Sequence, residues 1–328
     1  MRAIDSVRSQ TWKDISIVVR DNCSEDATEG LVLNIVNVDP RIIYIKNDKN
    51  IGAFENMKQG LQSVETKFFS ILSDDDYLEP EFYSEAMKLF IQYPDAGFVA
   101  FSVNVVDEGG KILNSNMSDD NYPIRSIYYN SEDGMDGYLH GIFPSTWTGY
   151  VFKKDVFSSI GFAEFSEVGH GGDIIFIWHA ASRFNFVVSN FRAANFMAHS
   201  QSTSSTMVNV FDERFLYWWR NRMLIIRDDP NVSDVVKYKI SKYYLTHSTK
   251  SFYSFKYYLI AAILLMIDRI KKGQYKELSF DFIAMRSFLS WSILIGIKFS
   301  VIVLVYLKLD DRLRSLIRLV RSTTKSTR

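Results

Sequence analysis

The chain has 328 residues, of which 38 are Lys or Arg and 38 are Asp or Glu, so its formal net charge is zero. That balance argues against a protein whose main partner is a polyanion, and we expect no nucleic-acid partner. Hydrophobic residues make up 47% of the chain and charged residues 23%, which excludes a mainly disordered chain and allows a sizeable core.

Four short apolar segments in the first hundred residues predict β-strands, at 15–19, 42–45, 68–72 and 98–101. Between them, apolar side chains recur every three or four residues, which is typical of helices. Strands that alternate with helices of this length pair in parallel through right-handed crossovers, and near-continuous apolar strands indicate a sheet covered on both faces. The sequence therefore predicts an open α/β sheet.

Polar side chains follow three of these predicted strands: Asp21 after the first, residues 47–52 after the second and residues 74–76 after the third. In open α/β sheets, ligands bind beyond the carboxyl ends of the strands. We therefore expect the functional site at that edge.

Beyond residue 104 the pattern becomes looser. We predict, in chain order, a hairpin turn at 107–111, a polar surface loop at 115–135, a strand at 148–152, a helix at 173–183 and a Ser/Thr-rich loop or linker at 201–206.

The C-terminal region has a helical pattern with two membrane-related features. Residues 287–307 have about the length of a membrane span, but Lys298 lies in the middle, where a charge costs roughly 2.5–3.5 kcal/mol on insertion scales. Basic and apolar side chains then interleave over 312–328, which is typical of a helix lying on an anionic membrane surface. The alternative is a packed helical bundle with a solvated basic end.

The most informative motif is the acidic run Asp74-Asp75-Asp76. Three adjacent carboxylates repel one another, so a cation normally compensates them. Hard oxygen ligands at a turn after a strand suit Mg²⁺ or Mn²⁺, which in turn bridge phosphate oxygens. The alternative is that one aspartate caps a helix beginning near Glu79-Pro80 while the others are solvated.

Three motifs in order, VVRDNCSEDAT (18–28), NIGAFENMKQGL (50–61) and SDDDYLEP (73–80), resemble the nucleotide-sugar domain of the family 2 glycosyltransferases, which have the GT-A fold. The resemblance covers residues 1 to 104 and continues more weakly to 205. It implies a nucleotide-sugar-binding half at 1–104, an acceptor-binding half at 105–205 and a helical region at 206–328 that associates with membranes. Among relatives, the chain is weakly similar to O-antigen deoxyhexose transferases.

The resemblance also implies roles for the residues that match these motifs. Asp21 corresponds to the aspartate that hydrogen-bonds the nucleotide base, Asp74 to a residue near the ribose or phosphate, and Asp75 to the principal metal ligand, with Asp76 in support. Ser73 occupies the position of the family's usual first aspartate. The residues that match the donor-binding helix start are Asn50, Gly52 and Asn56. Plain turn and helix-capping roles are the alternatives.

On the acceptor side, Asp173 in GHGGDIIF (169–176) matches the family's general base, although Gly172 replaces the preceding glutamate. His199 matches a histidine near the diphosphate or metal, and Trp147 is a candidate for stacking on an acceptor sugar. The alternatives are a helix N-cap for Asp173, a polar loop residue for His199 and core packing for Trp147.

The resemblance thus predicts an inverting transferase that uses Mn²⁺ or Mg²⁺ to move a sugar from a nucleotide diphosphate to a lipid-linked glycan, in bacterial O-antigen or capsule assembly. The one cysteine, Cys23, fits a reducing compartment, and we expect a cytoplasmic protein on the inner face of the plasma membrane. Because the family has a strand before the helix that here begins at Arg2, we expect this chain to be N-terminally truncated and weakly stable or weakly active. The alternatives are a sugar nucleotidyltransferase and a non-catalytic membrane scaffold.

Overall fold

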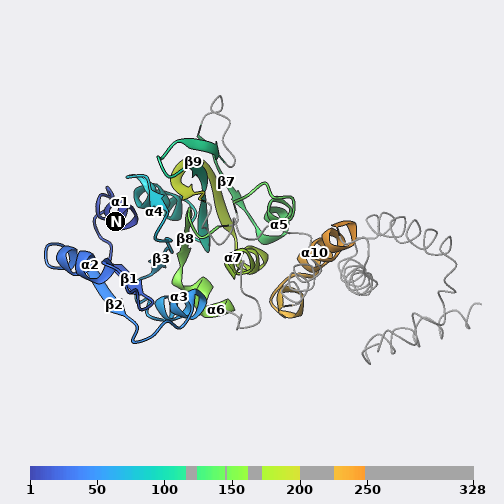
Figure 1. Ribbon diagram of the computed structural model, residues 1–328. Coiled ribbons are helices and arrows are strands. Elements are labelled where there is room, and N and C mark those ends of the chain that lie inside the picture. Colours follow the sequence, from blue (N-terminus) through green and yellow to red (C-terminus); the bar gives the residue numbers. More distant parts are fainter. Residues whose placement is uncertain (116–123, 145, 162–171, 200–224, 248–328) are drawn as a thin grey trace, which may run out of the picture. The chain divides into compact units, whose positions relative to one another are not determined.

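The computed structural model describes residues 1–115, 124–144, 146–161, 172–199 and 225–247 (Figure 1). Contacts divide the chain into two units, Met1–Ile240 and Ser241–Arg328. The described helices are α1 (Arg2–Arg8), α2 (Thr28–Val36), α3 (Ala53–Gln62), α4 (Phe82–Gln92), α5 (Ser131–Leu139), α6 (Lys154–Ile160), α7 (Gly172–Arg183) and α10 (Asp234–His247).

Within the described residues, the strands form two separate sheets. In the small sheet, β1 (Ile17–Asp21) and β2 (Ile42–Lys46) pair in parallel, with Ile17 opposite Ile42. The large sheet has the order β3-β8-β5-β9-β4, with β6 beside β5 and β7 beside β9. Its strands are β3 (Phe68–Phe69), β4 (Tyr77–Leu78), β5 (Phe98–Val106), β6 (Ile112–Ser115), β7 (Ser126–Tyr129), β8 (Tyr150–Lys153) and β9 (Phe186–Met197).

The predicted α/β class and strand locations are confirmed, but the predicted parallel pairing holds only in part. Parallel pairs are β1 with β2 and β5 with β9, and the other pairs of the large sheet are antiparallel. β3 and β5 do not pair with each other, because β8 lies between them and runs antiparallel to both. An apolar strand sequence indicates that both faces of the strand are buried. It does not indicate whether the neighbouring strands run parallel or antiparallel to it.

The predictions beyond residue 104 have mixed outcomes. The turn at 107–111 is confirmed: Gly110 N donates to Asp107 O at 2.8 Å between β5 and β6. The helix at 173–183 is confirmed as α7, and the strand at 148–152 begins two residues later as β8. The predicted loop at 115–135 is wrong where β7 and the start of α5 lie. β7 is a four-residue strand, SIYY, with no buried residue, and it lies within a stretch that is otherwise largely polar.

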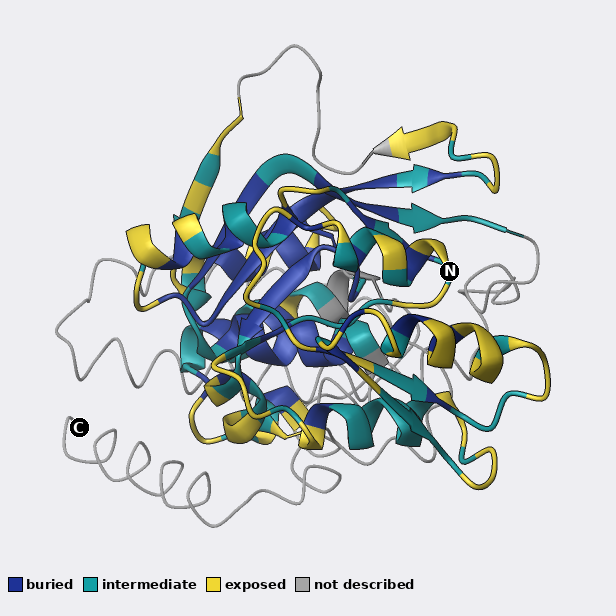
Figure 2. Ribbon diagram, turned by 90° about the vertical axis from the view of Figure 1, so that its left-hand side faces the viewer, coloured by how far each residue is buried: buried dark blue, intermediate teal, exposed yellow. Residues whose placement is uncertain are grey.

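Helices cover both faces of the large sheet, as expected. Phe101 of β5 packs against Phe82 of α4 on one face. On the other face, Phe98 of β5 stacks on Phe186 of β9, and Phe152 of β8 contacts Phe176 of α7. These contacts place buried aromatic side chains on both sides of the sheet, and the strands of the sheet are coloured largely as buried in Figure 2.

Residues 225–247 include α10, which agrees with the helical expectation for the C-terminal region. The predicted membrane segments at 287–307 and 312–328 lie outside the described residues, as does the linker at 201–206. Among the helices that the structure describes, none combines the length and the apolar character needed to cross a membrane. The division of the chain at 104 and 205 stays a prediction.

Candidate active site

Asp21 ends β1 and is 4% exposed. Its Oδ1 accepts a hydrogen bond from Ser24 N at 2.7 Å, and its Oδ2 accepts one from the Tyr44 hydroxyl. Burial raises the pKa of Asp21, but these hydrogen bonds outweigh burial and hold the pKa below its ordinary value. Asp21 is therefore an ionised acceptor at the carboxyl end of its strand, where the sequence predicted a base-binding residue.

An asparagine network joins the loops that follow β1 and β2. Asn50 Oδ1 accepts from Gly52 N at 2.9 Å and from Asn22 Nδ2 at 2.8 Å. Asn56 donates to the backbone oxygen of Arg20 at 3.1 Å and accepts from Asn47 Nδ2 at 2.9 Å. These bonds connect the two loops, but no side chain among the described residues caps the start of α3, so they do not amount to the helix-capping alternative. The contact of Asn50 and Asn56 with a nucleotide stays a prediction.

Gly52 has a positive φ of 85°, and a Cβ added there would meet no heavy atom within 4 Å. The left-handed backbone, rather than crowding, is therefore what favours glycine at the start of α3. Its predicted close approach to the donor stays a prediction.

The acidic run lies between β3 and β4, and its three side chains have different environments. Asp74 is exposed, Asp75 is half-buried and Asp76 is fully buried. Asp76 Oδ1 accepts from Met197 N at 2.9 Å, and Asp76 Oδ2 accepts from the Thr148 hydroxyl. Burial raises the pKa of Asp76 to about 6, and the neighbouring charges of Asp75 and Asp74 act in the same direction.

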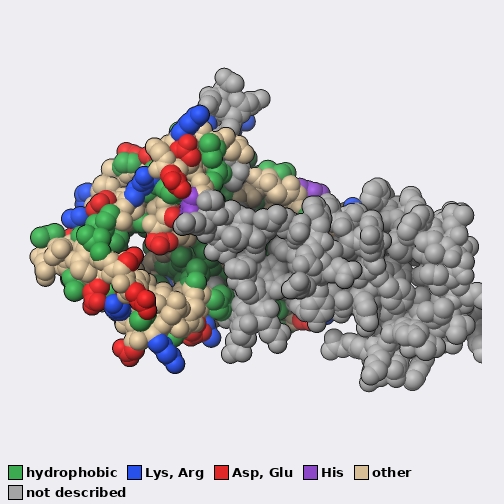
Figure 3. Space-filling model, viewed as in Figure 1, with side chains coloured by type: hydrophobic (Ala, Val, Ile, Leu, Met, Phe, Trp, Pro, Cys, Tyr) green, Lys and Arg blue, Asp and Glu red, His purple; other side chains and the backbone are tan. Residues whose placement is uncertain are grey.

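The register of β4 on β9 brings His199 to the acidic run. β4 pairs antiparallel with β9, with Tyr77 opposite Asn195, so the residues after β9 return beside the residues before β4. His199 Nε2 consequently lies 3.1 Å from Asp75 Oδ2. Acidic side chains and a histidine gather around a hollow on this face of the molecule (Figure 3).

The other two acceptor-side candidates lie near β8. Asp173 is half-buried in the first turn of α7, and its charge adds to the burial that raises the pKa of Tyr150. Trp147 is 5% exposed and packs against Phe176 at 5.1 Å between ring centroids. That placement agrees with the core-packing alternative, and a stacking role for Trp147 stays a prediction.

The side chains near Asp75 fit a divalent cation whose coordination is completed by a bound substrate. Within the described ranges, no three side chains of His, Cys, Asp or Glu converge as a ready metal site. Mg²⁺ is commonly held by one or two protein carboxylates, with substrate phosphates and water as the other ligands. Asp75 and His199, with Asp74 beside them, supply such a partial set.

Tyr44, Thr148 and the backbone of Met197 also contact the predicted site residues, although none of the motifs contains them as a predicted site residue. Tyr44 has a detectable signal, because it is a polar residue within an apolar strand that ends beside Asp21. Thr148 and Met197 have none, since their contact with Asp76 spans 72 and 121 residues of sequence.

Comparison with known proteins agrees with this geometry. Residues 1–160 match the family model described as glycosyl transferase family 2. The chain is 29% identical over 164 residues to the Campylobacter jejuni GalNAc(5)-diNAcBac-PP-undecaprenol beta-1,3-glucosyltransferase, a match that covers 50% of each protein. It is 31% identical over 107 residues to the Rhizobium meliloti succinoglycan biosynthesis protein ExoO, covering 33% of this chain and 29% of that protein.

An uncharacterized glycosyltransferase of Methanocaldococcus jannaschii is 30% identical over 112 residues, which are 34% of this chain and 39% of that protein. The matches therefore span half or less of the length of these relatives. Among solved structures, S. aureus TarS residues 1–349 in complex with UDP is similar in fold, with a TM-score of 0.56 and 14% identity. The match covers 76% of this chain and 68% of that one.

Proposed function

Residues 1–160 belong to glycosyltransferase family 2, and from that premise we propose that the chain transfers a sugar from a nucleotide diphosphate donor to a glycan acceptor with inversion at the sugar carbon. The observation that carries the proposal is the contact of Asp75 with His199, which gathers metal-binding groups at the carboxyl-end edge of a GT-A fold. The family match favours transfer over the nucleotidyltransferase and scaffold alternatives.

In the proposed reaction, Asp21 accepts a hydrogen bond from the nucleotide base and Asp74 lies toward the ribose or phosphate. Asp75 and His199 would hold Mn²⁺ or Mg²⁺. A cation held there would supply positive charge to stabilise the departing diphosphate. Asp173 removes the proton from the acceptor hydroxyl as its oxygen attacks the sugar carbon, and the bond from that carbon to the diphosphate breaks with its electron pair on the leaving group. Asp173 is half-buried in the first turn of α7, which leaves its carboxylate partly open to an acceptor.

Donor binding tests this proposal. We expect the wild-type chain to bind at least one nucleotide diphosphate sugar more tightly with Mn²⁺ than without it, when a panel of donors is titrated calorimetrically. In Asp75→Ala, the increase in donor affinity caused by Mn²⁺ should fall by more than about tenfold. Loss of a group that only hydrogen-bonds a metal ligand already costs about that much, so loss of the ligand itself should cost more. Asp14→Ala, which changes an exposed aspartate beside β1, should bind like the wild type. Binding that is independent of Mn²⁺ in the wild type would contradict the metal-dependent reaction.

We further propose a lipid-linked acceptor and a peripheral location on the inner face of the plasma membrane, as part of bacterial surface polysaccharide assembly. The support is the basic and apolar pattern at 312–328 and the name of the Campylobacter relative, which includes an undecaprenol diphosphate. Deletion of residues 285–328 should reduce binding to anionic liposomes in a sedimentation assay by about 1 kcal/mol for each basic residue that touches the surface. Equal sedimentation of the two proteins would rule out this role for the tail.

A further inference from the structure

Asp76 differs from its neighbours in the acidic run because its side chain faces the interior. Asp74 is exposed, Asp75 is half-buried and Asp76 is 0% exposed. A carboxylate loses much of its hydration when buried, so a buried aspartate is normally held by hydrogen bonds. Asp76 follows this rule, since each of its oxygens has a donor: Met197 N at 2.9 Å and the Thr148 hydroxyl.

These two hydrogen bonds join three distant segments of the chain. Thr148, just before β8, is 72 residues from Asp76, and Met197, the last residue of β9, is 121 residues from it. The segments meet beside the candidate metal ligands. Asp75 is adjacent to Asp76, and His199 follows Met197 by two residues and lies 3.1 Å from Asp75 Oδ2. The position of Asp75 relative to His199 therefore depends on the bonds that Asp76 makes.

We propose that Asp76 and Thr148 are positioning residues, which hold Asp75 against His199 without binding the metal themselves. We call the Thr148–Asp76–Met197 contact the Asp76 clamp. This inference rests on the proposed function, since it takes Asp75 and His199 as the protein ligands, and it reassigns Asp76 from supporting ligand to positioning residue.

The directions of the side chains support that reassignment. The Asp75 side chain is partly open to solvent, whereas the Asp76 side chain is completely buried. A diphosphate and its cation enter from solvent, so they meet Asp75 before Asp76. Groups that orient a metal ligand from behind are typically worth about 10–100-fold in metal affinity or activity, which is the size of effect expected for the clamp.

Four substitutions separate a positioning role from a ligand role. Thr148→Val removes the hydroxyl with little change of shape and leaves the acidic run intact, whereas Thr148→Ser keeps the donor. Asp76→Asn keeps both bonds, because its amide oxygen can accept from Met197 N and its amide nitrogen can donate to the Thr148 oxygen. Asp75→Asn is the matched change at the neighbouring position, and it weakens a group assigned to the metal.

The experiment measures Mn²⁺ binding to the full chain by electron paramagnetic resonance with the tightest-binding nucleotide donor present, because donor phosphates complete the proposed site. A melting curve in chelator establishes that each variant is folded. Relative to the wild type, Thr148→Val should bind Mn²⁺ about 10–100-fold more weakly, while Thr148→Ser should bind within about threefold. Asp76→Asn should also stay within about threefold, and Asp75→Asn should lose at least about tenfold.

Two outcomes would overturn the clamp while leaving the proposed function in place. If Asp76→Asn loses Mn²⁺ as completely as Asp75→Asn, then Asp76 is itself a ligand. If folded Thr148→Val binds Mn²⁺ as tightly as the wild type, then the hydroxyl does not position the site. A wild-type chain that binds no Mn²⁺ with the donor present would instead contradict the metal-dependent function, and the clamp with it.

Discussion

Tyr44 supports the ionised form of Asp21, and this contact predicts a pH effect. In Tyr44→Phe, Asp21 loses one of its two main hydrogen bonds, so its pKa rises from its lowered value. A hydrogen bond to a charged group contributes about 1.5–3 kcal/mol, of which we expect about 1 kcal/mol, or roughly fivefold, to appear as weaker donor binding at neutral pH. Because the folded pKa of Asp21 is depressed, ionisation is complete well above it and is lost as the pH falls. Donor affinity should therefore decline at a higher pH in Tyr44→Phe than in the wild type.

Calorimetric titration with the tightest donor between about pH 4 and pH 8 measures both effects. The control is Tyr93→Phe, which removes a hydroxyl that accepts from Gln92 on α4. Tyr93→Phe should follow the wild-type curve. If the Tyr44 and Tyr93 variants give the same pH dependence, the hydroxyl of Tyr44 has no role at Asp21.

At this scale the sequence indicated single residues more reliably than the pairs they form. Asp75 and His199 were each recognised, but nothing in their spacing gave the contact between them, because it depends on the pairing of β4 with β9. Trp147 shows a different difficulty: an aromatic residue suits both a sugar and a core, and its packing against Phe176 is not visible in the sequence. Side-chain chemistry can be predicted from sequence, whereas partners distant along the chain cannot.

At the scale of elements, apolar runs identified the buried strands, and the misses have physical causes. β8 was expected as a strand, but its antiparallel place between β3 and β5 depends on side chains from three parts of the chain. The loop predicted at 115–135 from its polar residues overlaps the start of α5, which is polar and also contains Gly134 and Gly137, and glycine is unfavourable within helices.

Packing explains these two glycines. A Cβ at Gly134 would lie 2.2 Å from the ring of Phe186, and one at Gly137 would lie 2.1 Å from the ring of Phe143. Glycine therefore lets α5 approach the aromatic layer closely, and the propensity cost is offset by burial of the two rings. The sequence shows that each glycine has a low helix propensity, but it does not show which aromatic ring occupies the space beside it.

For the whole molecule, α1 links the two sheets, which share no hydrogen-bonded strand pair among the described residues. Toward the large sheet, Gln10 at the end of this segment donates to Glu79 O at 2.7 Å, and Ser6 accepts from Leu78 N at 3.1 Å. Toward the small sheet, Arg8 Nε donates to Asp39 Oδ2 at 3.1 Å. The contacts of the α1 segment thus help to fix the position of Asp21, on the small sheet, relative to the acidic run beside the large sheet.

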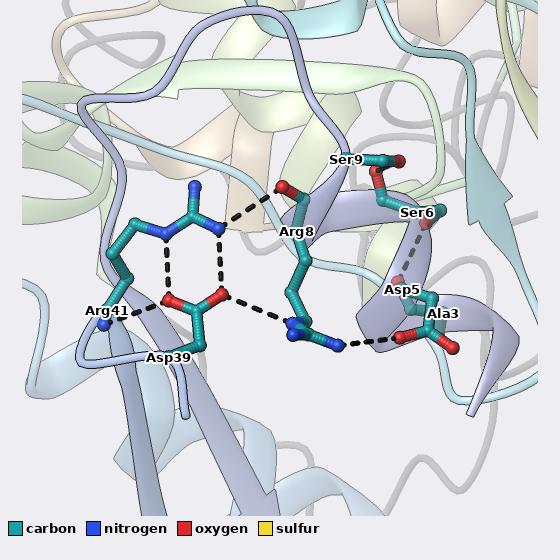
Figure 4. A network of polar contacts seen from close by, with 7 residues as sticks. All are labelled: Ala3, Asp5, Ser6, Arg8, Ser9, Asp39 and Arg41. Carbon is teal, nitrogen blue, oxygen red and sulfur yellow. Dashed lines mark hydrogen bonds and ion pairs between the residues drawn. The ribbon is translucent and has the colours of Figure 1, made fainter. Parts of the chain in front are cut away.

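Asp39 is the central acceptor of the network on the small-sheet side (Figure 4). It binds Arg41 Nη2 at 2.7 Å through Oδ2, and Arg41 Nη2 also donates to the backbone oxygen of Arg8 at 3.1 Å. Hydrogen bonds from Arg41, and then from Arg8, hold the pKa of Asp39 well below its ordinary range. A carboxylate with a depressed folded pKa stabilises the native state above its unfolded pKa, and that stabilisation is lost as the pH falls toward the folded value.

Asp39→Asn should therefore lower the melting temperature by at least a few degrees at neutral pH, because two guanidinium groups lose their shared charge. The difference from the wild type should narrow as the pH falls below about 4, where the unfolded chain binds a proton at this carboxylate. Asp5→Asn is the matched control, since the Asp5 side chain is 55% exposed and pairs with the same Arg8. An exposed ion pair contributes little, so this variant should melt close to the wild type at every pH. If the difference in melting temperature between Asp39→Asn and the wild type is the same at pH 3 and pH 7, then the charge on Asp39 does not hold α1 to the small sheet.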